Sequence, residues 1–165
     1  MIFKRIPLIW GAELEGSAGR GSRSPRALSV RPRLDQLGSL YARLALAGAF
    51  LSGIASRFGL WGKDVGYGNF ANFTRYTADV NSFMPAFTIP LLAWASTVAE
   101  LVLGLALLFG IARRWVAWGS ALLLALFGVA MAISFGPKSP LDYSVFSASA
   151  AALLLGLRSD PAALS

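Results

Sequence analysis

The feature that most constrains this chain is a set of long stretches with almost no charge. Trp115 to Phe135 contains no Asp, Glu, Lys or Arg, and Ala86 to Gly110 contains one charged residue, Glu100. An α-helix rises ~1.5 Å per residue, so ~20 apolar residues cross the ~30 Å hydrocarbon core of a bilayer. Both stretches reach that length, and we expect each to form a transmembrane helix.

Two further stretches complete the expected membrane domain. Leu37 to Phe58 has Arg43 and Arg57 near its two ends, and Leu141 to Leu157 has a single acidic residue near its start. Of all residues 56% are hydrophobic and 14% are charged, whereas about a quarter are charged in a soluble domain. The sequence therefore predicts an all-α fold, a membrane-embedded four-helix bundle over residues 37–158.

The segments around these helices have a different composition. Residues 1–36 are basic, rich in Gly, Ser and Arg over part of their length, and indicate a disordered extension. Residues 159–165 form a short tail. The connection 59–84 carries four glycines and six aromatic residues. We expect it to contain a short helix around Phe70 to Thr77 and either to cover the bundle mouth or to form an aromatic belt at the headgroups.

Lys and Arg are distributed unevenly between the two ends of the predicted bundle. With the N-terminus inside, ten of them fall on the cytoplasmic side and three fall on the outer side, as the positive-inside rule requires. Four spans would return the C-terminus to the cytoplasm. The net charge of +7 then has an explanation in membrane topology. No nucleic-acid partner is expected, because the basic extension lacks interleaved aromatic residues.

Glu100 is the most informative residue, because it lies in the middle of a predicted span. An unpaired charge in hydrocarbon costs several kcal/mol. Such a residue therefore faces the bundle interior or finds a partner. Arg43 lies at a comparable expected depth in the preceding span. We expect an intramembrane ion pair between Arg43 and Glu100, which acts either as a functional site or as a structural lock. The alternative for Arg43 is contact with phosphates of the inner leaflet.

A second polar cluster is expected on the outer side. Arg57 and Lys138 fall near the outer face, with Asp142 and Tyr143 close to Lys138. Together they form a possible pocket for an anionic or quinone-like headgroup. Two simpler interpretations remain open. The cations can anchor the chain at the headgroups, and the carboxylate can cap the helix that follows Ser139 and Pro140.

The chain contains no cysteine and no histidine. It therefore has no disulfide or thiol chemistry of its own, and no imidazole ligand for a metal or haem. We expect no metal site and no covalently bound cofactor. Any redox role needs a bound organic cofactor, such as a quinone, or a partner protein.

Several short motifs resemble those of the DoxX family of small four-helix bacterial membrane proteins. They are Arg43 followed by Phe50 to Phe58, then Glu100 to Gly110, then Gly136 to Tyr143. The resemblance covers about residues 37–158. The family usually has lysine in place of Arg57, and many members carry a histidine that this chain lacks.

The resemblance implies a bacterial inner-membrane subunit linked to a redox system, either quinone-linked or concerned with thiol stress, with the bilayer and a redox protein as partners. We expect no catalytic centre in this chain, although the sequence does not decide whether it is an enzyme. The alternative is a small proton-coupled carrier with Glu100 as the coupling site. A third possibility is a purely structural assembly factor.

Overall fold

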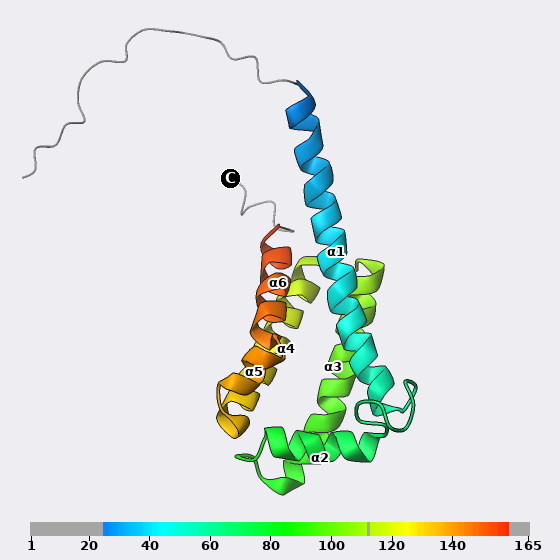
Figure 1. Cartoon of the computed structure of the whole chain (residues 1–165), viewed down its shortest axis with the longest axis vertical. Coiled ribbons are helices and arrows are strands. Elements are labelled where there is room, and N and C mark those ends of the chain that lie inside the picture. Colours follow the sequence, from blue (N-terminus) through cyan, green and yellow to red (C-terminus); the bar gives the residue numbers. More distant parts are fainter. Residues whose placement is uncertain (1–24, 112, 159–165) are drawn as a thin grey trace, which may run out of the picture.

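The computed structural model describes residues 25–111 and 113–158, and every regular element within those ranges is a helix (Figure 1). The prediction of an all-α membrane fold is confirmed. The elements are α1 (Pro25–Arg57), α2 (Phe70–Val80), the 3₁₀ turn η1 (Ala86–Thr88), α3 (Ile89–Phe109), α4 (Arg113–Phe135), α5 (Lys138–Asp142) and α6 (Val145–Arg158).

Three of the described helices are long and apolar enough to cross a membrane: Arg33–Arg57, Ala86–Phe109 and Arg113–Phe135. The fourth predicted span is not one helix. It is divided into α5 and the 14-residue α6, because Ser144 adopts a left-handed backbone with φ of 54°. A helix of that length rises only ~21 Å, so a fourth crossing stays a prediction.

Four helices nevertheless pack around one core. α1 packs mainly on α3, and α4 packs mainly on α6. Their shared core consists of Leu46, Ala47, Phe50, Leu107, Ala117, Ala121, Ala152 and Leu155. Small residues allow this close packing. A Cβ at Gly104 would lie 3.2 Å from the Cβ of Phe50, so α1 and α3 are almost in backbone contact there.

The boundary of the N-terminal extension differs from the prediction. α1 begins at Pro25, so residues 25–36 are helical, and the first turns of α1 project past the other helices (Figure 1). Residues 1–24 and 159–165 lie outside the described residues, so the predicted disordered extension is assessed only from residue 25 onward. Arg158 forms a 3.3 Å ion pair with Asp35 and ties the end of α6 to α1.

The short helix expected in the long connection is present as α2. Asn69 caps it, accepting a hydrogen bond from the Asn72 amide at 2.9 Å. Phe73, Thr77 and Val80 are buried, and their spacing of three to four residues places them on one face of the helix. α2 lies across the end of the bundle (Figure 1) and contacts α1, α3 and α4.

Candidate functional site

The centre of the site is an ion pair between Arg57, the last residue of α1, and Glu100 in the middle of α3. Nη2 of Arg57 donates to Oε1 of Glu100 at 2.5 Å. Nη1 of Arg57 donates to Oγ1 of Thr97 at 2.8 Å. Arg57 and Glu100 are each only 4% exposed, so two opposite charges compensate each other away from solvent.

The predicted ion pair between Arg43 and Glu100 is wrong. Nε and Nη2 of Arg43 donate to the carbonyl of Leu107 at 3.2 and 2.9 Å. Leu107 lies seven residues beyond Glu100 on α3, which is ~10 Å along the helix axis. The guanidinium of Arg43 therefore adds to the hydrogen bond that the Leu107 carbonyl accepts from the Gly110 amide at 3.3 Å, at the C-terminal end of α3, where a cation is favourable.

Phe73 of α2 covers the guanidinium of Arg57. The Arg57 carbon Cζ lies 3.8 Å from the centre of the Phe73 ring, a cation–π contact. Nε of Arg57 is buried and has no hydrogen-bond partner among the described residues. A buried donor without a partner is costly, about 1–3 kcal/mol. The packed helices therefore leave the Arg57 guanidinium with one unsatisfied donor, which has almost no accessible surface of its own.

A cavity of about 1000 Å³ adjoins this ion pair at the α2 end of the bundle. Its wall has an apolar part and a polar part. The apolar part belongs to α3 and α4 and includes Leu92, Leu123, Leu124, Phe127 and Met131. The polar part includes Arg57, Tyr67, Tyr76, Asn81, Glu100 and Tyr143. The cavity therefore suits a molecule with one polar end and one hydrocarbon end.

Two tyrosines from the long connection contribute to the polar wall. Ser56 Oγ accepts a hydrogen bond from the Tyr67 amide at 2.9 Å, and the ring centres of Tyr67 and Tyr76 are 5.4 Å apart. Burial, together with Tyr76, raises the pKa of Tyr67 to about 12, although Arg57 acts in the opposite direction. Burial also raises the pKa of Tyr76. Both phenols therefore stay protonated at neutral pH and can donate a hydrogen bond.

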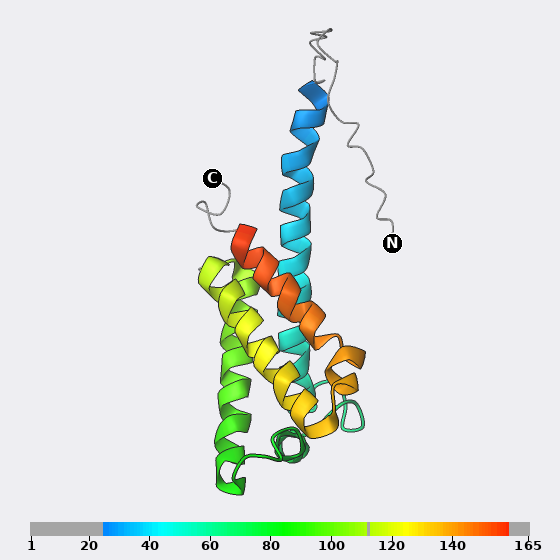
Figure 2. The same ribbon diagram turned by 90° about the vertical axis from the view of Figure 1, so that its left-hand side faces the viewer.

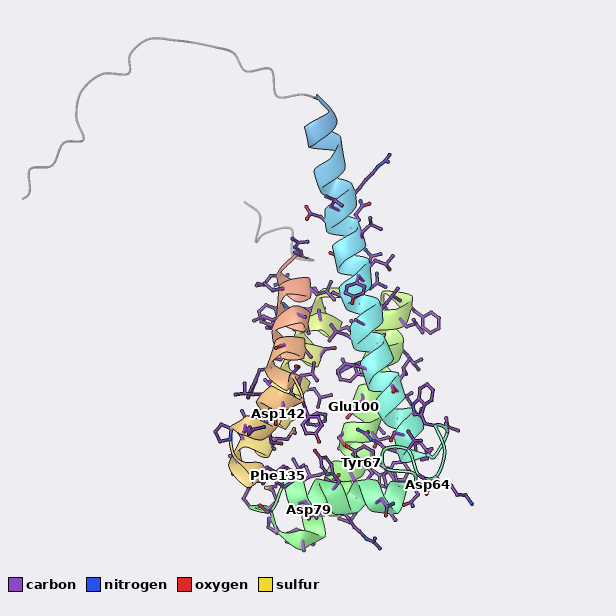
Figure 3. The ribbon with its side chains drawn as sticks, viewed as in Figure 1. Asp64, Tyr67, Asp79, Glu100, Phe135 and Asp142 are labelled. Atoms are coloured by element: carbon purple, nitrogen blue, oxygen red, sulfur yellow. The ribbon has the colours of Figure 1, made fainter. Side chains whose placement is uncertain are left out.

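The predicted outer cluster is divided between two places. Lys138 and Asp142 form an exposed ion pair within α5, whereas Arg57 is bonded to α3. Figure 3 shows Glu100 and Tyr67 between the helices, above α2. Asp142 lies to one side of them, on α5. Tyr143 is the one predicted neighbour of Lys138 that reaches the cavity, since it lines the same wall as Arg57.

Sequence reasoning missed Thr97 and Phe73, which complete the coordination of Arg57. Thr97 lies three residues before Glu100, so both side chains point from one face of α3. That spacing was a usable signal. Phe73 gave no comparable signal, because six aromatic residues share the connection and only the folded position of α2 selects one of them.

Comparison with protein families gives one match. A family model described as methylamine utilisation protein MauE matches residues 36–142, about two thirds of the chain. Searches of curated proteins and of solved structures give no match. The matched family differs from the DoxX family, although both consist of small bacterial membrane proteins. The motifs thus indicated the class of protein, a small bacterial membrane protein, whereas the family whose model matches is MauE.

Proposed function

Because this chain belongs to the MauE family of membrane proteins associated with methylamine utilisation, we propose that it is an accessory subunit of a bacterial redox system. In this proposal it binds a quinone-like molecule in the cavity beside Arg57 and Glu100 and supplies no catalytic centre itself. Electron transfer then takes place on a partner protein. The absence of cysteine and histidine from the sequence supports that division of roles.

The observation that carries the proposal is the amphipathic cavity with a buried ion pair in its wall. The opposite charges of Arg57 and Glu100 offset each other, so the polar wall favours an uncharged headgroup over an anion. The protonated phenol of Tyr67, which lines the cavity, favours a headgroup that accepts hydrogen bonds. A quinone ring has two carbonyl acceptors and no net charge, and its tail would match the leucines of α3 and α4.

The geometry favours a binding role over the proton-coupled carrier that the sequence also suggested. A coupling carboxylate must exchange its proton with water on each side of the membrane in turn. Glu100 is 4% exposed, and its partner Arg57 is fixed by Thr97 and Phe73 as well. Arg57 is thus fixed by three contacts, which favours a static role in the wall of a binding site over repeated protonation and deprotonation of Glu100.

The orientation with both termini in the cytoplasm is part of the proposal. At the α2 end, the three basic side chains Lys63, Arg75 and Lys138 are offset by three acidic ones, Asp64, Asp79 and Asp142. At the other end the described basic residues outnumber the single acidic residue, Asp35. The positive-inside rule then assigns the α2 end to the outer face, and the proposed headgroup would lie in the outer leaflet.

The test is binding of decylubiquinone to the purified chain in phosphatidylcholine nanodiscs, measured by quenching of tryptophan fluorescence. We expect saturable binding by the wild-type chain. Replacing both partners, Arg57→Met with Glu100→Met, keeps the charge balance and the side-chain volume and should weaken binding by about tenfold or more. The matched control, Lys138→Met with Asp142→Met, removes the exposed pair and should leave binding unchanged. No saturable binding by the wild-type chain would contradict the proposal.

A further inference from the structure

α3 and α4 are close at one end of the bundle and apart at the other. The turn between Phe109 and Arg113 joins them, and near it a Cβ at Gly119 would lie 3.3 Å from Leu103. Away from the turn the two helices diverge, and α2 is seen end-on between their separated ends (Figure 2). α2 contacts both. Residues of all three helices line the cavity, and we call the part of its wall where α3 and α4 diverge the window.

Two side chains mark the rim of this window on the spanning helices. Ala95 of α3 and Leu126 of α4 line the cavity and are also exposed at the surface. Both belong to helices that are long and apolar enough to cross the membrane. An exposed position on such a helix contacts either the cavity or acyl chains, so Ala95 and Leu126 are the positions at which the cavity would meet the hydrocarbon of the bilayer.

We propose that this window, with Ala95 and Leu126 as its rim, is a lateral portal through which a membrane-dissolved molecule reaches Arg57 directly from the bilayer. The identity of that molecule rests on the proposed function, whereas the portal itself does not. The ligand therefore comes from the bilayer and not from the aqueous phase. Its hydrocarbon tail remains between α3 and α4, in continuity with the lipid, while its headgroup turns toward Arg57 and Tyr67.

α2 covers part of the end of the cavity that faces water (Figure 1). α2 crosses it and places Phe73, Thr77 and Val80 inward, and the Arg57 guanidinium is stacked under Phe73. The polar route that competes with the portal passes Tyr143, which lines the cavity and is 72% exposed. A water-soluble ligand would use that route, so the two routes can be separated by the solubility of a probe.

The absence of cysteine from the chain allows a clean experiment. Ser96 lines the cavity on α3, and Ser96→Cys introduces one thiol there with little change in volume. The full chain in phosphatidylcholine vesicles is treated with an uncharged alkyl methanethiosulfonate, which dissolves in the bilayer, or with a charged sulfonate reagent of the same class. We expect the alkyl reagent to modify this thiol faster than the charged one, relative to their rates with an exposed thiol at Lys63→Cys.

Substitutions at the rim then test the portal itself. Leu126 is 57% exposed and Leu122, one helical turn earlier on α4, is 62% exposed, but only Leu126 lines the cavity. Leu126→Trp should slow the alkyl reagent by about tenfold or more, and the matched Leu122→Trp should leave the rate within about twofold. Ala95→Trp gives a second block from the α3 side. Faster reaction with the charged reagent, or equal rates in the Leu126 and Leu122 variants, overturns the portal.

Decylubiquinone separates the portal from the proposed function. If the proposed function holds, an excess of this quinone slows modification of the thiol at position 96 in the unblocked chain. If the quinone gives no protection while Leu126→Trp still slows the reaction, the portal stands and the quinone is not the ligand. If rim variants have no effect while the quinone protects, the site stands and its ligand uses another route.

Discussion

The two ends of the helix bundle each contain an arginine from α1, half-buried for Arg43 and buried for Arg57, and they differ in what that arginine binds. At the end near Gly110, Arg43 bonds the carbonyl of Leu107. At the α2 end, Arg57 bonds a carboxylate and a hydroxyl and retains a free Nε. The first end is closely packed, with Gly104 against Phe50. The second contains the cavity.

This difference assigns a stabilising role to the end that contains Arg43 and a binding role to the end that contains Arg57. The guanidinium of Arg43 makes its hydrogen bonds within the bundle, at a helix C-terminus where a cation is favourable, so Arg43 needs no ligand. Arg57 and Glu100 bring charge into a region where apolar packing would be at least as stable. The α2 end is therefore the part of the molecule whose polar groups are best explained by something that binds there.

The largest expected effect comes from breaking the ion pair on one side only. Arg57→Gln leaves Glu100 buried without its cation, and we expect a loss of about 3–5 kcal/mol in the free energy of unfolding. The double variant Arg57→Met with Glu100→Met removes both charges and should recover most of that loss. Denaturant unfolding in detergent micelles measures both. Equal losses of unfolding free energy in the single and double variants would show that the two charges do not offset each other's burial.

The arginine of the closed end should matter less. Arg43→Met removes two charge-assisted hydrogen bonds to the Leu107 carbonyl and leaves it with the Gly110 amide as its donor, so we expect a loss of about 1.5–3 kcal/mol. Binding of decylubiquinone should be unaffected, since Arg43 does not line the cavity. A loss of binding without a loss of stability in this variant would contradict the division between the two ends.

Added volume should distinguish the two ends in the same way. Gly104→Val must displace Phe50 and Leu51, and overpacking of this kind costs about 1–3 kcal/mol. Ala130→Val adds two methyl groups at a half-buried position on the cavity wall, where space exists, and should change stability by less than about 0.5 kcal/mol. The same unfolding measurement applies. A cost at Ala130 similar to that at Gly104 would mean that the cavity is not available space.

The last effect appears only at high pH and concerns the phenol of Tyr67, whose pKa burial raises to about 12 in the folded chain. Folding therefore favours the protonated phenol, and this contribution to stability is fully present below the unfolded pKa near 10. It is lost as the pH rises from there through about 12. The ultraviolet absorbance of tyrosinate, taken as the difference between the wild-type chain and Tyr67→Phe, should titrate near the higher value. Titration near 10 would place Tyr67 in water.

Much of the fold follows from charge alone, because a polypeptide segment without ionised groups has few stable environments outside a bilayer. The segments around Glu100 and after Trp115 are helices close to their predicted limits. The division of the last segment at Ser144 was not predicted. A left-handed backbone at serine carries no composition signal, and Pro140 and Asp142 indicated only that a helix begins there.

The site was predicted in part. Glu100 was recognised because a carboxylate in hydrocarbon demands a partner, but the partner depends on how far α1 slides along α3. That register is set by the contact between Gly104 and Phe50 and by the cap that Arg43 gives α3, which are properties of the packed helices. The same holds for the cavity, because the separation of α3 from α4 depends on where α2 lies.

The most direct measurement of the central claim is the quinone content of the protein purified from its native membrane, determined by mass spectrometry of the extracted lipids. The account predicts bound quinone in a fixed ratio to the wild-type chain and its loss from the double variant Arg57→Met with Glu100→Met. The variant Lys138→Met with Asp142→Met, which lacks only the exposed pair, should retain it. Equal trace amounts in all three proteins would contradict the account.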